Sequence, residues 1–286
     1  MTEQTERGRE GGRTGSILRS ILPALIVLLL LAFGRDAAAQ GDPQALAPLF
    51  AGLEGAFVVC DDGGEMCTRY NPDLAAERFP PFATVDIVLT LIGLDTGAIP
   101  GPDIAVIREK EPEPDDDASG GIAEPQLDLR TAFGQSAAWY FDEVTGRVGR
   151  ERVAATLADI GYGNADMAGA VDPAQFEDRL RISPDEQVAL TGRLLRGDLP
   201  FSPSTVAVLE DVAVVERSED FVLRGRLGAG PGGEGRHVWF VGWLETDVGR
   251  YPCATFLKVD NPDAPADQGL AMTLAALRRT GVLPGG

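Results

Sequence analysis

Residues 78–97 read RFPPFATVDIVLTLIGLDTG, and this stretch predicts an apolar helix that begins near Thr84. The helix is expected to end with Leu94-Asp95-Thr96-Gly97. Thr84 places a hydroxyl group at the N-terminus of this helix, where threonine most often caps the helix or packs against it. The alternative is that this hydroxyl acts on a substrate. The stretch therefore predicts an apolar helix whose first turn carries a hydroxyl group.

Other short motifs occur in a fixed order along the chain. They are GAFVV at 55–59, YNP at 70–72, LRTAF at 129–133, SAAWYF at 136–141, YGN at 162–164, IS at 182–183 with EQ at 186–187, LPF at 199–201 and WFVGW at 239–243. Together with the helix above, they resemble the class D, or oxacillinase-type, β-lactamases and the related penicillin-sensor domains, from about residue 55 to residue 283.

The resemblance implies the penicillin-recognising serine-enzyme fold. This is an α+β fold, an α/β sandwich whose antiparallel sheet of five or more strands is flanked by helices. A mostly helical lobe is inserted into it, and the family binds substrate in the cleft between lobe and sheet. The resemblance implies neither a cofactor nor a metal ion.

In this family a Ser-x-x-Lys element opens the helix that corresponds to residues 83–86. The serine attacks the substrate carbonyl group, and the lysine helps to remove the serine proton. Here the serine slot holds Ala83 and the lysine slot holds Asp86. A methyl group is not a nucleophile, and a carboxylate cannot donate hydrogen bonds as an ammonium group does. The resemblance therefore implies a β-lactamase-like pseudoenzyme in which both slots are degenerate.

Three further family positions are changed. The Lys-Thr-Gly strand motif reads Arg226-Leu227-Gly228, the segment with the shielding tryptophan reads Ala174-Gln175-Phe176, and the carboxylate-binding arginine of the last helix aligns with Gly269. The binding candidates are the residues that survive in, or replace, the family's catalytic set. They are Ser136, Tyr162, Asn164, Arg226 and Gly228. Most losses are polar groups, as expected for a fold retained without its chemistry.

Asp86 and Arg226 are expected to form an ion pair, because they occupy slots on the helix and on the strand that faces it. A carboxylate alone in a partly apolar cleft is costly or takes up a proton. An arginine offsets that cost through a charge-assisted hydrogen bond that can be bidentate. The pair is expected to plug part of the former substrate site, with Ser136 or Tyr162 as a third partner. The alternative places Arg226 in solvent and leaves Asp86 to cap a helix or bind water.

The N-terminal segment is typical of a secretory signal peptide. Arginines between positions 7 and 19 precede an apolar run of about 13 residues at 21–33, and three alanines at 37–39 supply a small-residue cleavage site. The run is short for a membrane span, and an uncleaved anchor is the alternative. The chain is thus divided into a signal peptide at 1–39, a short lead-in at 40–54 and the β-lactamase-like domain at 55–286. The protein is expected to be exported, to the periplasm or outside the cell.

The chain is strongly acidic, with a formal net charge of −19 over 286 residues. Without residues 1–39 it keeps 20 basic and 40 acidic side chains. This excess disfavours nucleic acid and anionic membrane surfaces as partners. The densest acidic run, 109–117, contains prolines and predicts a loop. A solubilising surface explains the charge most simply, and an acidic recognition face is the alternative.

Cys60 and Cys67 flank Asp62-Gly63-Gly64-Glu65, and a Gly-Gly pair suits a type I′ turn. In a hairpin with this two-residue loop, the cysteines face each other at a Cα spacing of about 5.5 Å or below, which a disulfide can span. A Cys60–Cys67 disulfide is therefore expected in an exported protein, and two free buried thiols are the alternative. Cys253, on an expected strand, is expected to be a packed thiol.

Periodicity and capping signals predict the remaining elements. A hairpin is expected at 55–70, helices at 136–147, 150–160 and 183–195, another helix from Ser202, strands at 220–227, 237–246 and 250–259, and a terminal helix at 266–279. The helix at 183 opens with Ser183-Pro184-Asp185-Glu186, a capping box with proline in its first turn. His237, the one histidine of the chain, is expected to be a solvated strand end rather than a base.

Three functions are compatible with these residues. The prediction is an exported pseudoenzyme that binds a β-lactam, a peptidoglycan peptide or a protein partner without a covalent bond. The first alternative is a weak or altered β-lactam hydrolase that uses Ser136 or Thr84, with Asp86 as the base for Ser136. The second alternative is a structural subunit of an active relative.

Overall fold

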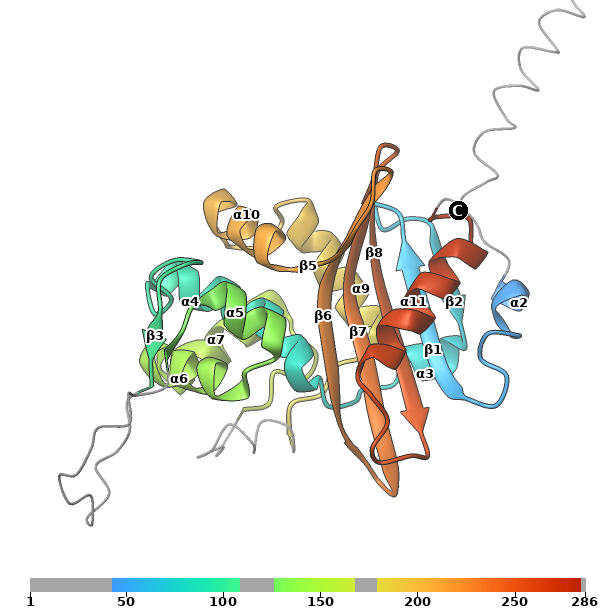
Figure 1. Ribbon diagram of the computed structural model, residues 1–286, viewed down its shortest axis with the longest axis horizontal. Helices are drawn as coiled ribbons and strands as arrows, with labels where there is room; N and C mark the ends of the chain where they lie inside the picture. Colours follow the sequence, from blue (N-terminus) through green and yellow to red (C-terminus); the bar gives the residue numbers. More distant parts are fainter. Residues whose placement is uncertain (1–42, 109–125, 168–178, 284–286) are drawn as a thin grey trace, which may run out of the picture. The chain divides into compact units, whose positions relative to one another are not determined.

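A six-stranded antiparallel sheet is the centre of the fold (Figure 1). The computed structural model describes residues 43–108, 126–167 and 179–283. The strands lie in the order β2-β1-β8-β7-β6-β5, and each pairs antiparallel with its neighbour. Their bounds are β1 Glu54–Cys60, β2 Cys67–Tyr70, β5 Val214–Arg217, β6 Phe221–Gly232, β7 Gly235–Thr246 and β8 Arg250–Val259. The expected antiparallel sheet of five or more strands is confirmed.

Helices cover both faces of the sheet. Helix α9 (Pro184–Leu195) packs against β8, β1 and β7, and α11 (Asp267–Arg279) packs against β8 and β7 (Figure 1). In β7, Trp239 and Trp243 are buried in the core on the α9 side, whereas Phe240 is buried in the core on the α11 side. Because successive side chains of a strand point to opposite faces, a strand buried along its length needs cover on both sides. The expected sandwich is confirmed.

A mostly helical lobe is inserted between β2 and α9 in the chain. Its elements are the 3₁₀ helix η2 Phe82–Val85, α4 Asp86–Thr96, β3 Val106–Ile107, β4 Gln126–Leu127, α5 Leu129–Gln135, α6 Ala138–Val148 and α7 Arg150–Ile160. Leu91, Tyr140 and Leu157 are buried inside the lobe and belong to the same core cluster as Trp239. This shared core fixes the lobe against the α9 side of the sheet, and the expected lobe is confirmed.

Three short or peripheral helices complete the described structure. They are α2 Pro43–Leu46, α3 Pro72–Ala76 and α10 Pro203–Val212. Leu46 and Phe50, from the segment expected to be a lead-in, are buried in the core on the α11 side. The side chain of Ser202 caps α10 by accepting a hydrogen bond from the N–H of Thr205. Capping therefore fixes the start of α10, as the sequence predicts.

The expected capping box at the start of α9 is also present. The Ser183 hydroxyl accepts from the N–H of Glu186 at 3.2 Å, and the Glu186 carboxylate accepts from the N–H of Ser183 at 2.9 Å. Two N–H groups that the helix cannot pair internally are thereby satisfied. At the end of α4, Gly97 has a φ of 76°, a conformation in which glycine avoids the clash of a Cβ atom.

The β1–β2 hairpin places Cys60 opposite Cys67, and the two form the expected disulfide, with Cα atoms 4.1 Å apart. The expected type I′ turn is wrong, because Gly64 has a positive φ of 72° and its glycine neighbour does not. Asp61 organises the loop instead: its carboxylate accepts from the next two N–H groups after Gly64. A wider turn therefore keeps the same cysteine register. Cys253 is buried and free, as expected.

Some elements differ from the expectation. The helix expected to begin near Thr84 starts as η2 at Phe82 and becomes α-helical at Asp86. The helix expected at 136–147 starts at Ala138, and a separate helix, α5, precedes it. Strand β5 has no counterpart among the expected strands, and β6 continues to Gly232. The last part of β6 is rich in glycine, so its composition is typical of a loop even though it pairs with β7.

Candidate functional site

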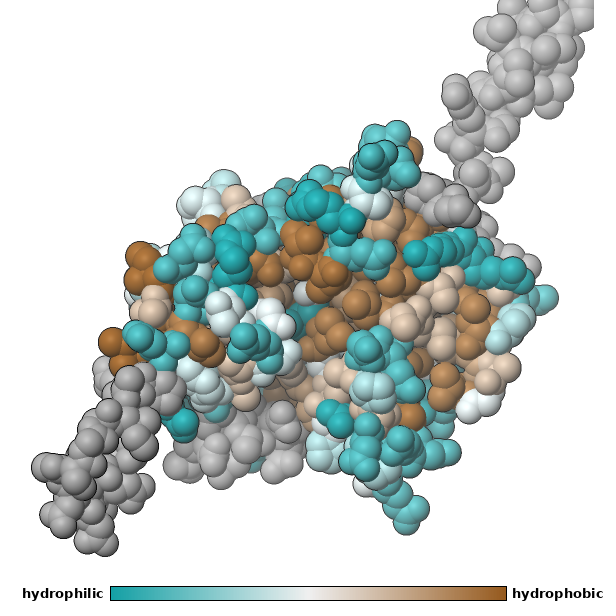
Figure 2. Space-filling view, viewed as in Figure 1, coloured by the Kyte–Doolittle hydropathy of each residue, from teal (hydrophilic) through white to brown (hydrophobic). Residues whose placement is uncertain are grey.

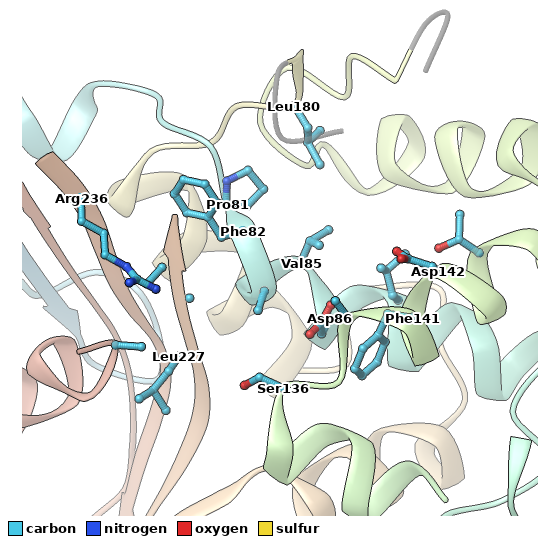
Figure 3. Close-up of a pocket in the computed structure, with 17 residues that line it drawn as sticks. Pro81, Phe82, Val85, Asp86, Ser136, Phe141, Asp142, Leu180, Leu227 and Arg236 are labelled. Carbon is cyan, nitrogen blue, oxygen red and sulfur yellow. The ribbon is translucent and has the colours of Figure 1, made fainter. Parts of the chain in front are cut away.

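A cavity of about 320 Å³ lies where η2, α4 and the α5–α6 junction meet β6 (Figure 3). Most side chains on its wall are apolar. The polar ones are Asp86, Ser136, Asp142, Thr145 and Arg236. Figure 2 shows apolar residues gathered over β5 and β6, between the helical lobe and α11. An apolar cavity with a few polar groups is typical of a site for a small ligand.

The turn before α4 places Ala83 on the cavity wall. Phe82 has a φ of 47°, which is uncommon for a residue with a Cβ atom, and its ring packs over a glycine of β6. The Thr84 hydroxyl donates to the Pro81 carbonyl at 2.7 Å and accepts from the Gln187 amide at 3.0 Å. Thr84 is therefore a buried packing residue whose hydroxyl is used inside the protein, rather than a helix cap.

Asp86 and Arg226 form the expected buried ion pair. The Nε and Nη2 atoms of Arg226 lie 3.1 Å and 2.5 Å from Oδ2 of Asp86. The side chains of Asp86 and Arg226 are 8% and 4% exposed. Both nitrogens bind the same oxygen, so these two contacts differ from the fork-to-fork geometry that arginine and carboxylate can adopt.

Groups from the lobe also hold Arg226. Its Nε donates to the carbonyl of Ala83 at 3.3 Å, and its Nη1 donates to the carbonyl of Phe133. The guanidinium carbon lies 4.6 Å and 5.6 Å from the ring centres of Phe133 and Phe141, within the range of a cation–π interaction. Arg226 thus ties β6 to η2, α4 and α5.

The environment of Asp86 changes its acidity. Burial raises the pKa of Asp86 to about 6, because the loss of hydration outweighs the attraction to Arg226. The negative charge of Asp142 raises it further. At neutral pH Asp86 is therefore mostly ionised and paired, and it takes up a proton in mildly acidic solution.

Two other candidates, Ser136 and Gly228, lie on the cavity wall. Ser136 follows α5 with a φ of 54°, a left-handed conformation that turns the chain toward α6. Gly228 lies in β6, where an added Cβ atom would come within 3.0 Å of the carbonyl oxygen of Pro81. A larger residue at 228 would therefore push η2 away from β6.

Tyr162 and Asn164 are not among the residues that line the cavity. Tyr162 is fully buried, its hydroxyl accepts from Gln187 at 3.5 Å, and burial raises its pKa. The side chain of Asn164 bonds to main-chain groups of residues 179 and 181. Ser136 or Tyr162 was expected to be a third partner of the ion pair, and this expectation is wrong. In the described structure neither hydroxyl hydrogen-bonds to the pair, because main-chain carbonyls supply the further acceptors for Arg226.

Strand β6 offers an unpaired edge to the cavity. The N–H of Gly225 donates to the carbonyl of Ala213 at 2.8 Å, on the side that β5 covers. N–H groups alternate in direction along a strand, so those of Leu227 and Ala229 point to this same edge, beyond the last residue pair with β5. No described main-chain hydrogen bond outside the paired strands involves either of these two N–H groups. Leu227 and Ala229 also line the cavity.

Sequence reasoning missed Arg236, which is the one cation among the cavity-lining residues of the described structure. It lies in β7 opposite Pro231, in a glycine-rich stretch whose composition is typical of a loop. Continuing the alternation of β7 backward from Phe240 and Val238 places Arg236 on the same face. That alternation was the signal available in the sequence.

His237 is not the solvated strand end that was expected. Its ring centre lies 5.4 Å from that of Phe79 and 5.0 Å from that of Phe256. Partial burial lowers the pKa of the imidazole, and its Nδ1 atom is buried with no hydrogen-bond partner among the described residues. A neutral histidine packed against aromatic rings explains these contacts, and His237 does not line the cavity.

Several sequence expectations fall outside the described residues. They are the signal peptide at 1–39, the acidic run at 109–117 and the segment at 174–176 that replaces the shielding tryptophan. Gly269 is described, and an added Cβ atom there would lie 2.8 Å from the carbonyl carbon of Trp239. Helix α11 therefore packs too closely on β7 for a side chain at this position.

The described parts of the chain contain neither a candidate membrane span nor a candidate metal site. No helix there is both long and apolar enough to cross a membrane. No group of three histidine, cysteine, aspartate or glutamate side chains there is arranged to hold a metal ion.

Comparisons with known proteins identify the family. The family model of the penicillin binding protein transpeptidase domain matches residues 41–221. β-Lactamase OXA-20 of Pseudomonas aeruginosa is 30% identical over 237 residues, which cover 81% of this chain and 84% of that protein. The crystal structure of the class D β-lactamase YbXI from Nostoc has a TM-score of 0.72 and 27% identity, covering 83% of this chain and 99% of that one.

A domain of a penicillin receptor matches this chain with the same TM-score. The C-terminal domain of the BlaR penicillin receptor of Bacillus licheniformis has a TM-score of 0.72 and 26% identity, covering 84% of this chain and 96% of that one. The chain therefore belongs to the class D β-lactamase family of penicillin-recognising proteins. The resemblance read from its short motifs is confirmed.

Proposed function

We propose that this protein is a catalytically degenerate member of the class D family that binds a β-lactam or a peptidoglycan peptide without a covalent bond. The observation that carries the proposal is Ala83 on the wall of an open cavity. Its position corresponds to the attacking serine of the family motif, and a methyl group forms no acyl-enzyme. The lysine position holds Asp86, which is bonded to Arg226.

The remaining volume supports binding over a purely structural role. Arg226 lies behind Asp86 and does not line the cavity, so the ion pair leaves about 320 Å³ open. Pockets for small ligands are roughly 300–1,000 Å³ in volume, and this one lies at the lower end of that range. A subunit with only a structural role has no need to keep such a cavity open.

The N–H groups at the edge of β6 favour a ligand with an extended backbone. The N–H groups of Leu227 and Ala229 point past β5 and line up along the cavity. A peptide that lies beside this edge can accept hydrogen bonds from both, in the manner of an added strand. A β-lactam has an amide and a ring carbonyl group that can accept from the same donors.

The likeness to a receptor domain also favours binding. BlaR is named a penicillin receptor, and its C-terminal domain shares the fold of this chain. We extend that binding role to this chain because its cavity is open while its nucleophile position is inert.

A hydrolase that uses Thr84 or Ser136 is less well supported. The Thr84 hydroxyl donates to a carbonyl group inside the protein and is 1% exposed. Ser136 is exposed on the cavity wall, but the base proposed for it, Asp86, already accepts two hydrogen bonds from Arg226. Ser136 is therefore the residue to test for residual chemistry.

We also propose that the protein is exported. The Cys60–Cys67 disulfide suits an oxidising compartment, and the sequence of residues 1–39 is typical of a signal peptide. Edman sequencing of the secreted protein is expected to begin near Gln40. A first residue that is still Met1 in exported material would contradict cleavage.

Intact-mass spectrometry after incubation with benzylpenicillin tests the proposed function. The full chain is expected to keep its mass, to bind the ligand in calorimetry and to leave hydrolysis near the uncatalysed rate. A stoichiometric adduct would contradict the proposal, and the Ser136→Ala variant would show whether Ser136 carries it. If the protein binds neither benzylpenicillin nor a peptidoglycan stem peptide, the proposed ligand-binding role is contradicted.

A further inference from the structure

Arg236 supplies the one guanidinium group among the described residues that line the cavity. It lies at the start of β7, is half-buried and lines the cavity. Figure 3 shows its side chain extending from the strand toward the middle of the view, where Ser136 and Asp86 lie. Arg236 shares a face of the sheet with Leu227 and Ala229, so it reaches the open edge of β6 from the α11 side.

The guanidinium of Arg236 lacks a full set of partners. Its Nε atom is buried without a hydrogen-bond partner in the described structure. Its Nη1 atom lies 3.4 Å from the carbonyl of Pro262, near the outer limit for a hydrogen bond. None of the described carboxylates forms an ion pair with it. A partly desolvated charge without a counter-ion is unfavourable, so an anion that enters the cavity and reaches the guanidinium would compensate its charge.

The charged groups make the electrostatic potential differ between the two ends of the cavity. Arg226 compensates Asp86, whereas the carboxylate of Asp142 lies on the opposite side from Arg236 in Figure 3, with Asp86 and Ser136 between them. The charge of Asp142 is felt inside the cavity, because it acts on Asp86. An anionic group is therefore attracted at the Arg236 end and repelled at the Asp142 end.

We propose that Arg236 is the anion-binding residue of the cavity and that it holds the carboxylate of the ligand, with the rest of the molecule directed toward Asp142. A planar guanidinium matches a carboxylate with two parallel hydrogen bonds. The identity of the ligand as a β-lactam or a peptide C-terminus rests on the proposed function, and both have a carboxylate. The anion site itself stands on the geometry of Arg236.

Calorimetry with matched acid and neutral ligands tests the assignment. Benzylpenicillin is expected to bind the full-length protein at least about tenfold more tightly than its methyl ester, because the ester cannot pair with the guanidinium. Arg236→Ala is expected to remove this difference, and Arg236→Lys to keep part of it, since lysine retains the charge and loses the planar fork. Arg217→Ala is the control, because it makes the same change in charge at an exposed residue of β5.

A second pair of probes separates this inference from the proposed function. Ligand-observed NMR with 4-phenylbutyrate and its primary amide tests the anion site without a β-lactam. If neither benzylpenicillin nor a peptidoglycan stem peptide binds but 4-phenylbutyrate binds in an Arg236-dependent way, the proposed function fails and the anion site stands. If neither acid is preferred over its neutral partner, or if Arg236→Ala leaves the preference intact, the assignment of Arg236 is overturned.

Discussion

Two arginines from neighbouring strands lie near the same cavity, Arg226 behind Asp86 and Arg236 on the cavity wall, and their surroundings differ. Arg226 has a carboxylate, two carbonyl groups and two aromatic rings around it, and its side chain is 4% exposed. Arg236 is half-buried, and its buried Nε has no partner in the described chain. The comparison indicates that the Asp86–Arg226 side of the cavity, called the closed end below, is held by contacts within the protein and joins the lobe to the sheet. The Arg236 side, the open end, keeps a donor for a ligand.

Removal of Arg226 is expected to have the largest effect on the free energy of unfolding. Arg226→Ala leaves Asp86 buried without its partner and should lower the free energy of unfolding by about 3–5 kcal/mol. Arg236→Ala strands no partner and should cost less than about 1 kcal/mol. Urea denaturation followed by tryptophan fluorescence measures both. Equal costs for the two variants would contradict the distinction between a closed and an open end.

A double replacement provides the control for that experiment. Asp86→Leu combined with Arg226→Met removes both charges and keeps apolar volume, so it should recover most of the stability that Arg226→Ala loses. A double variant as unstable as the single one would show that the carbonyl groups and rings around Arg226, rather than the charge pair, account for the cost.

Asp86, at the closed end, should make the free energy of unfolding depend on pH. Its pKa is about 6 in the folded protein against an ordinary value of 3.8, so the folded state binds this proton more tightly than the unfolded state. The contribution to stability is fully present below pH 3.8 and is lost as the pH rises through about 6. The loss amounts to about 3 kcal/mol.

The Asp86→Asn variant isolates this effect, because asparagine does not titrate. Urea denaturation of both proteins between pH 4 and pH 7.5 should show the native protein losing stability relative to the variant as the pH rises. A constant difference, or a native protein that gains relative to the variant, would contradict the raised pKa of Asp86.

The disulfide should contribute less to the free energy of unfolding than Arg226 does, and it should not affect ligand binding in the cavity. It joins β1 to β2, at the opposite edge of the sheet from β5 and β6. Replacement of Cys60 and Cys67 by serine should lower the free energy of unfolding by about 2–3 kcal/mol, in the chain-entropy account of a short closed loop. Benzylpenicillin affinity should stay unchanged, and a loss of affinity would show that the two edges are coupled.

Restoring the family's serine and lysine at positions 83 and 86 is expected to have the smallest effect. Ala83→Ser combined with Asp86→Lys restores the motif but places a lysine beside Arg226. Catalytic groups that act as a unit give little when restored in part, so β-lactam turnover should stay near the uncatalysed rate. Ala83→Ser alone is the control. Robust turnover by the double variant would show that the cavity is still built for hydrolysis.

The sequence predicts best where a local signal exists. The capping box at Ser183 and the Cys60–Cys67 register depend on residues close in the chain, and both were correct. The Asp86–Arg226 pair was predictable because opposite charges replaced two facing family positions. The carbonyl partners of Arg226 were not, since any residue supplies a carbonyl and its position depends on the whole fold. Arg236 was missed because glycine-rich composition concealed a strand.

Equilibrium dialysis of the full chain against radiolabelled benzylpenicillin, followed by acid denaturation, distinguishes a binding protein from an enzyme. We expect one ligand per chain, released by denaturation as intact benzylpenicillin, and the same result for Ser136→Ala. Label that stays with the denatured chain, or that is recovered as the hydrolysed product, would contradict a cavity that holds its ligand without reacting with it.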